Sequence, residues 1–143
     1  MRSRAQTETM IHGRSGSRSG FTLIELLIVV VIIGILAAIA IPKFASTKEK
    51  AYLAKMKSDL RNLATAQESY LATNFAYYGG ALPNAALIYS PSAGVTITIP
   101  VASAAGWSGV ATMPGLTAKT CALYIGGVPP LAPATAEGQI TCS

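Results

Sequence analysis

Glu25 is the residue whose position most directly suggests chemistry, because it is the one charged side chain between Phe21 and Ile41. A helix over this apolar run, rising about 1.5 Å per residue, covers roughly 30 Å of hydrocarbon and can span a bilayer. A carboxylate packed among apolar helices must be neutralised. A helix N-terminus also favours a carboxylate in its first turn. The alternative is an interfacial residue that snorkels from the membrane edge.

Cys121 and Cys142 form the second candidate pair. The single histidine, His12, lies far away near the N-terminus, which argues against a zinc site. In an exported domain two cysteines favour a disulfide, whose loop of about 20 residues contributes roughly 3 kcal/mol in the chain-entropy model. Two unpaired buried thiols are the alternative.

No arrangement of residues predicts catalysis. The sequence has no phosphate-binding glycine loop, no nucleophile-elbow serine motif and no metalloprotease helix motif, and after the N-terminal segment it has no histidine to act as a base. The carboxylates Asp59, Glu68 and Glu137 are too scattered to propose as a pair. We therefore expect no enzymatic activity, no catalytic residues, no metal and no cofactor.

The composition predicts one small domain and one membrane anchor. The chain has 143 residues, of which 51% are hydrophobic and 12% charged. Of the net charge of +5, the residues before Phe21 carry +3, and a positive flank keeps that end of an apolar helix in the cytoplasm. The C-terminal domain is then exported, and its small remaining charge does not predict a basic binding face.

The first twenty residues are rich in Arg, Ser and Gly and predict an unstructured leader. Translation could start at Met1 or at Met10, and the sequence leaves both open. A secretory signal peptide cut near Ala37 to Ala40 is a further alternative, although the apolar run is longer than an ordinary signal core.

The run Gly20-Phe21-Thr22-Leu23-Ile24-Glu25, followed by an apolar helix, resembles the class III signal of type IV pilins and of the pseudopilins of type II secretion. The resemblance is strong from Gly20 to about Tyr78. It implies cleavage after Gly20 by a prepilin peptidase on the cytoplasmic side, N-methylation of Phe21 and retention of the helix. The new amine of Phe21 and the Glu25 carboxylate can then neutralise each other across neighbouring subunits. Such a pair adds little net stability, but it can set the axial register of one helix against the next.

Gly34 and Pro42 are expected to weaken the apolar helix between them. Proline in a helix interior costs about 3 kcal/mol and glycine about 1 kcal/mol. A simple kink is one interpretation. The resemblance implies a second one, in which the helix is continuous or gently kinked in the monomer and unwinds locally in an assembled filament.

After Pro42 the pattern becomes amphipathic and predicts a helix that buries one face against a sheet. Basic residues between Lys43 and Arg61 are assigned to a solvated or inter-subunit face, with contact to DNA as the alternative. Charged residues including Asp59 and Glu68 are placed mainly on the other faces. The residues expected on the apolar stripe are Phe44, Tyr52, Leu53, Met56, Leu60, Leu63, Gln67, Tyr70 and Leu71.

The remainder of the chain predicts an irregular loop followed by an antiparallel meander. Residues 75–92 are read as the loop, and alternating patterns predict strands over 95–101, 107–113 and 120–125. The closing Cys142 to Cys121 link resembles the C-terminal region of type IV pilins, with 126–139 as an exposed loop. The predicted fold is α+β, a long N-terminal helix on a sheet of about three to four strands. Its parts are a leader (1–20), a transmembrane and filament-core helix (21–42), an amphipathic helix (43–74) and a loop-and-sheet region closed by the disulfide (75–143).

Three functions are compatible with these features. The first is a structural subunit of a type IV pilus, resembling a type IVa major pilin. The second is a minor pilin or a pseudopilin of type II secretion, but this chain has Glu137 as its one carboxylate after Glu68 and therefore departs from the calcium-binding acidic loop of major pseudopilins. The third is a single-span membrane protein with an exported ligand-binding domain.

The pilin resemblance implies a set of partners and two locations. The partners are copies of the same chain, a peptidase that also methylates, an inner-membrane platform protein and an assembly ATPase. The chain would lie first in the inner membrane and then in an extracellular pilus.

Overall fold

The computed structural model describes residues 20–116 and 118–143 of the chain. The predicted leader therefore lies outside the described residues, apart from Gly20. The chain divides into two compact units, Met1–Ala40 and Ile41–Ser143.

Helix α1 (Leu23–Asn74) is the only helix among the described residues, and parts of it belong to each of the two units. It runs without interruption through Gly34 and Pro42. Proline has no amide hydrogen, so the carbonyl of Ala38 lacks its usual donor at this point. Just beyond Pro42, the hydroxyl groups of Ser46 and Thr47 both donate to the carbonyl of Lys43, at 3.0 and 2.9 Å.

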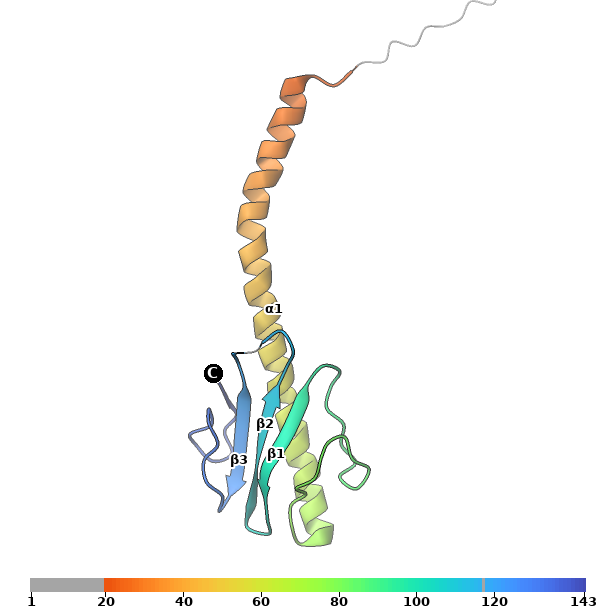
Figure 1. The fold of residues 1–143 in the computed structure, drawn as a ribbon, viewed down its shortest axis with the longest axis vertical. Helices are drawn as coiled ribbons and strands as arrows, with labels where there is room; N and C mark the ends of the chain where they lie inside the picture. Colours follow the sequence, from red (N-terminus) through yellow and green to blue (C-terminus); the bar gives the residue numbers. More distant parts are fainter. Residues whose placement is uncertain (1–19, 117) are drawn as a thin grey trace, which may run out of the picture. The chain divides into compact units, whose positions relative to one another are not determined.

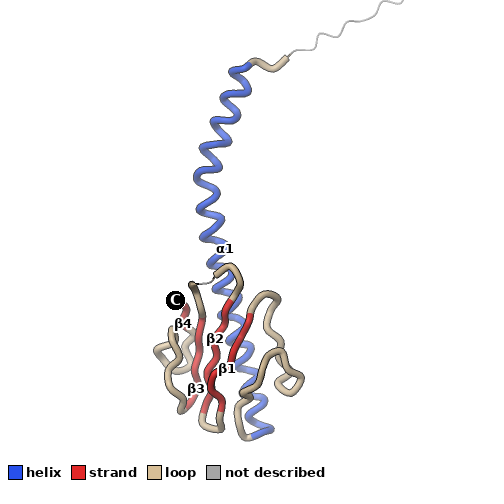
Figure 2. The backbone as a smooth tube through the Cα atoms, viewed as in Figure 1, coloured by secondary structure: helices blue, strands red, loops and turns tan. Residues whose placement is uncertain are grey.

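Four strands follow α1 and form one antiparallel sheet in the order β1-β2-β3-β4 (Figures 1 and 2). They are β1 (Thr96–Ala102), β2 (Gly106–Thr112), β3 (Cys121–Gly126) and β4 (Thr141–Cys142). The three strands predicted from alternation are confirmed to within about a residue at each end, and β4 is a short addition at the C-terminus. The predicted α+β fold is confirmed.

The main core lies between the second half of α1 and one face of the sheet. Met56, Leu60 and Leu63 are fully buried at spacings of four and three residues, and Trp107 of β2 packs against them. Gly109 makes room for the indole, since a Cβ there would lie 2.9 Å from the Trp107 ring. Gln67 is also fully buried, as the predicted stripe requires.

Two predictions about the helix faces are wrong. Phe44 is 75% exposed, because it precedes Met56 by twelve residues and, at about 100° per residue, lies about a third of a turn away from the buried stripe. Asp59 is predicted to lie away from the apolar stripe, but it is only 3% exposed. Its place three residues after Met56 and four before Leu63 puts it on the buried side.

The segment predicted as an exposed loop, 126–139, is partly buried. Val128 and Ala134 fold over the outer face of the sheet and form a second, smaller apolar cluster with Ala122 and Tyr124. The amide of Gly126 donates to the Glu137 carboxylate at 2.7 Å, and the amide of Gly138 donates to the carbonyl of Tyr124 at 2.9 Å. Both faces of β3 are therefore covered, which explains why four consecutive residues of this strand are buried.

Candidate processing and assembly site

The peptide bond between Gly20 and Phe21 lies just before α1, outside the helical segment. Both residues are exposed, and Phe21 has 88% of its surface accessible. Space around Gly20 is open, since a Cβ there would meet no atom within 4 Å. An endopeptidase needs an accessible backbone that is not held in a helix, and this bond meets both requirements.

Thr22 and Glu25 form a reciprocal cap at the start of α1. The Thr22 amide and hydroxyl donate to Glu25 Oε2 at 2.8 and 2.7 Å, and the Glu25 amide donates to the Thr22 hydroxyl at 3.3 Å. This is the capping box, in which the side chains at the N-cap and the third helical position satisfy each other's backbone amides. Glu25 Oε1 accepts no hydrogen bond from any described residue and remains available to a partner.

Sequence reasoning singled out Glu25 and missed Thr22. The signal was present, because a Thr followed three residues later by a Glu, directly before an apolar run, is the sequence signature of a capping box. The membrane-length apolar run makes the charge of Glu25 the more conspicuous feature, and it gives no sign of the hydrogen bonds to Thr22. The structure shows that the carboxylate also has a local role in starting the helix.

The apolar residues of the first unit are exposed around the whole circumference of the helix. Each large apolar side chain from Leu23 to Ile39 has about half or more of its surface accessible. A helix that is apolar on every side and exposed on every side requires lipid or other helices to cover it. Within the described residues, this is the one helix long and apolar enough to cross a membrane.

Two buried polar side chains of α1 fasten the loop that follows it. Gln67 makes a two-way contact with the backbone of Tyr78, donating to its carbonyl and accepting from its amide, both at 2.8 Å. Asp59 accepts from the amide and the hydroxyl of Ser92 at 3.1 and 2.8 Å. These two contacts hold the start and the end of the loop on the helix.

Tyr89 adds a third contact close to Asp59. Its hydroxyl donates to the backbone carbonyl of Asp59 at 3.0 Å. Burial raises the pKa of the Tyr89 phenol, and the negative charge of Asp59 raises it further. The phenol therefore stays protonated at neutral pH and keeps its donor.

Replacing Asp59 should loosen this loop. In Asp59→Ala the amide and hydroxyl of Ser92 lose their acceptor, and we expect the free energy of unfolding to fall by about 2 to 3 kcal/mol. Urea denaturation of the detergent-solubilised chain measures the loss, and hydrogen exchange at Ser92 localises it. Asp59→Asn keeps one acceptor oxygen and should lose less, whereas the exposed neighbour substitution Ser58→Ala should change little. Equal stability of Asp59→Ala and Ser58→Ala would contradict the role of Asp59.

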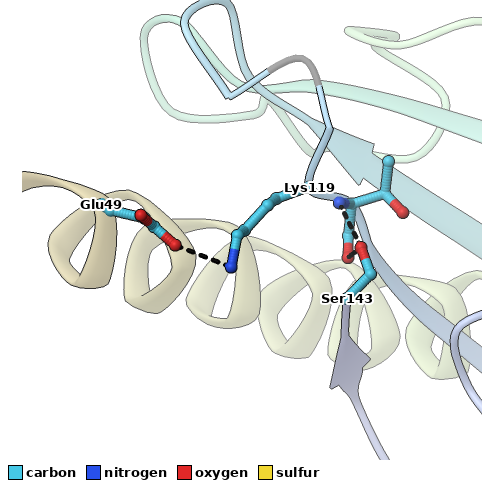
Figure 3. A network of polar contacts seen from close by, with 4 residues as sticks. Glu49, Lys119 and Ser143 are labelled. Carbon is cyan, nitrogen blue, oxygen red and sulfur yellow. Dashed lines mark hydrogen bonds and ion pairs between the residues drawn. The ribbon is translucent and has the colours of Figure 1, made fainter. Parts of the chain in front are cut away.

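The C-terminus is held to β3 by a disulfide and by backbone pairing. Cys121 and Cys142 are directly opposite each other in the β3–β4 register, and their side chains form the predicted disulfide. Beyond it, the amide of Ser143 donates to the carbonyl of Thr120 and the amide of Thr120 donates to the Ser143 hydroxyl, both at 3.1 Å. Figure 3 shows these contacts beside the ion pair of Lys119 with Glu49 of α1, at 2.8 Å.

Four of the six basic residues between Lys43 and Arg61 share one side of α1 and two lie on another. The four are spaced by seven, seven and four residues (Lys43, Lys50, Lys57 and Arg61), and the other two are Lys48 and Lys55. Lys55 donates to the carbonyl of Ala93 on the loop, and the Lys48 ammonium lies 5.5 Å from the centre of the Tyr52 ring. Two of the six are therefore engaged within the chain. Across residues 20–116 and 118–143, no three His, Cys, Asp or Glu side chains are grouped so that they could hold a metal ion.

Comparison with known proteins identifies a known family motif in the N-terminal segment. Residues 16–41 match the family model described as the prokaryotic N-terminal methylation motif. The chain is 47% identical over 60 residues to type II secretion system core protein G of Pseudomonas aeruginosa, covering 42% of each chain. It is 52% identical over 58 residues to type IV major pilin protein PilA of Myxococcus xanthus, covering 41% of this chain and 26% of the relative. A fimbrial protein of Pseudomonas aeruginosa is 51% identical over 53 residues, covering 37% of this chain and 34% of the relative.

The apolar N-terminal helix and the four-stranded antiparallel sheet on the second half of α1 are consistent with the α+β fold of type IV pilins. Together with the methylation motif and the pilin and pseudopilin relatives, they support a type IV pilin-like protein. The relatives are pilins and a type II secretion pseudopilin, and the matches span less than half of each of them. The matches therefore support a pilin or a pseudopilin.

Proposed function

We propose that this chain is the structural subunit of a type IV pilus. It is cut after Gly20, N-methylated at Phe21 and polymerised through its apolar helix into a surface filament. The observation that carries the proposal is an apolar helix exposed on all sides whose one carboxylate, Glu25, keeps a free oxygen at the end where processing creates an amine.

The hydrocarbon interior of a bilayer can cover the apolar surface, but it does not supply a cation for Glu25. Cleavage after Gly20 gives every subunit a positive amine four residues before that carboxylate. In a bundle of such helices the amine of one subunit can pair with the carboxylate of the next and set their relative height. This use of both groups favours a polymer over an isolated membrane anchor.

The C-terminal region favours a pilin over the second candidate, a pseudopilin of type II secretion. The disulfide closes the segment in the manner that the resemblance to pilins implies. Glu137, the one carboxylate after Glu68, already accepts the amide of Gly126. The similarity to core protein G of type II secretion lies in the N-terminal part that pilins and pseudopilins share, and it keeps that function as the alternative.

The proposed route begins in the inner membrane with the N-terminus in the cytoplasm. A prepilin peptidase that also methylates, an inner-membrane platform protein and an assembly ATPase are the proposed partners, and the filament itself is extracellular. The chain acts as a substrate and a building block and not as an enzyme. During assembly we expect the helix between Gly34 and Pro42 to unwind locally.

Mass spectrometry of filaments sheared from the producing cells tests the proposal. We expect this chain to dominate, to begin at N-methylated Phe21 and to carry the Cys121–Cys142 disulfide. The same processed species found only in the membrane fraction would favour a minor pilin or a pseudopilin. A chain that still carries the residues before Phe21 in assembled filaments would overturn the proposal.

A further inference from the structure

Trp107 is the single tryptophan of the chain and lies fully buried between α1 and the sheet. Its indole Nε1 has no hydrogen-bond partner among the described residues. An indole that loses an electron becomes a strong acid at this nitrogen. With no acceptor at hand the proton cannot leave, so the oxidised ring stays a cation and remains strongly oxidising.

Tyr77 is the aromatic neighbour through which this oxidation can move. Its ring centre lies 6.4 Å from that of Trp107, with the two planes tilted by 46°. The loop that follows α1 brings it there by returning toward the β1–β2 turn, where the Tyr77 amide donates to the carbonyl of Ser103 at 3.1 Å (Figure 1). The phenol is half-buried, so it connects the core with the surface.

The Tyr77 hydroxyl donates to Glu68 Oε1 at 2.9 Å. Burial and the Glu68 charge raise the pKa of this phenol, so it stays protonated at neutral pH. A phenol that is oxidised must release its proton in the same event, and the exposed Glu68 carboxylate can take it.

Tyr77 is distinguished from the other tyrosines by this acceptor. The hydroxyls of Tyr78, Tyr89 and Tyr124 donate to backbone carbonyls, which are far weaker bases than a carboxylate. Those of Tyr52 and Tyr70 donate to no described residue. Within residues 20–116 and 118–143, only Tyr77 combines a carboxylate acceptor with contact to the tryptophan.

We propose that Trp107, Tyr77 and Glu68 form a relay that carries an oxidising equivalent from the buried core to the surface. A one-electron oxidant, such as an oxygen-derived radical, first removes one electron from Trp107. The indole cation then takes one electron from Tyr77, whose phenolic proton passes to the Glu68 carboxylate. The products are a neutral indole, a neutral tyrosyl radical and a protonated Glu68, so charge and protons balance.

The relay would spare the core from irreversible oxidation. A radical left on Trp107 reacts inside the packed interface of α1 and β2. A tyrosyl radical at the half-buried Tyr77 can be reduced by a small thiol or another soluble reductant. The proposal is independent of filament assembly, because all three residues belong to one chain.

Laser flash photolysis of the detergent-solubilised full chain tests the relay. Excitation at the red edge of the indole absorption, where tyrosine does not absorb, ionises the single tryptophan, with nitrate present to capture the ejected electron. We expect the indolyl radical band to decay as a tyrosyl band grows. In Tyr77→Phe the tyrosyl band should be lost and the indolyl radical should live longer.

Two further variants separate the relay from a structural effect. Glu68→Gln keeps a hydrogen-bond acceptor but is a much weaker base, so the transfer should slow strongly while the near-ultraviolet circular dichroism stays unchanged. Tyr70→Phe is the control, because it removes a tyrosine that contacts Tyr78, at 5.5 Å between ring centres, and not Trp107. Its tyrosyl band should grow at the same rate as in the unsubstituted chain. Unchanged growth of the tyrosyl band in folded Tyr77→Phe would overturn the proposal, as would equal rates in Glu68→Gln and the unsubstituted chain.

Discussion

Glu25→Ala should abolish filament assembly while leaving membrane insertion intact. Removing a carboxylate from an apolar helix makes insertion easier, so the chain should still be found in the membrane. The amine of each processed Phe21 would then have no carboxylate to pair with in the filament core. Electron microscopy and sheared-fraction blots measure the filaments, and membrane fractionation measures insertion.

The capping box allows a sharper version of this experiment. Glu25→Gln can still accept from the amide and hydroxyl of Thr22, so it keeps the cap but loses the charge. Thr22→Ala keeps the charge but loses the hydroxyl that caps the Glu25 amide. If charge pairing drives assembly, Glu25→Gln should fail as completely as Glu25→Ala, and Thr22→Ala should still form filaments. Normal filaments from Glu25→Gln would show that capping, not charge, is the function of this residue.

Loss of the disulfide should be the largest change in stability. The bond closes a loop across a sequence separation of 21 residues. In the chain-entropy model, opening such a loop lowers the free energy of unfolding by about 3 kcal/mol, a large part of what a domain of this size has. We therefore expect the double substitution of Cys121 and Cys142 by Ser to shift the urea midpoint strongly downward.

Loss of the disulfide should loosen the C-terminal segment before it loosens the rest of the sheet. β4 has two residues and pairs with β3 only at Cys121 with Cys142 and at Ala122 with Thr141. Without the covalent link, hydrogen exchange should rise across 127–143, including Val128 and Ala134 of the second cluster, before it rises in β1 and β2. Reduced unsubstituted protein should behave like the double variant, and Ser143→Ala is the control for the hydrogen bonds to Thr120. A midpoint unchanged on reduction would contradict this assignment.

Much of the fold could be predicted from the sequence because it depends on periodicity. The alternation in β1 and the three- and four-residue spacing of Met56, Leu60 and Leu63 each identify an element and its buried side. The charge of Asp59 predicts a position away from the buried stripe, whereas its spacing from Met56 and Leu63 is that of a buried residue. Burial of that carboxylate depends on donors from Ser92, more than thirty residues later, and no local pattern reports them.

Some residues outside the main core could also be predicted from the sequence, and others could not. Phe21 and Glu25 could be found because their types and spacing are unusual at the head of an apolar helix. The burial of Val128 and Ala134 could not, because a proline-rich segment gives no periodic signal and its cover over β3 depends on Glu137 binding the Gly126 amide. Contacts that fold a loop back onto a sheet are set by tertiary geometry.

The hydrogen bonds by which Gln67 and Asp59 hold the loop after α1 affect how this protein can evolve. Gln67 binds only backbone atoms of Tyr78, and half of the Asp59 contact is with a backbone amide. Main-chain groups are the same in every residue type except proline, so these anchors place little demand on the sequence that they hold. Apart from Leu87, which is buried in the core, and Tyr89, whose hydroxyl donates to the Asp59 carbonyl, residues 79–91 can therefore change in sequence while the helix and the sheet stay the same. A lineage under pressure to alter its exposed surface could do so here at little cost to folding.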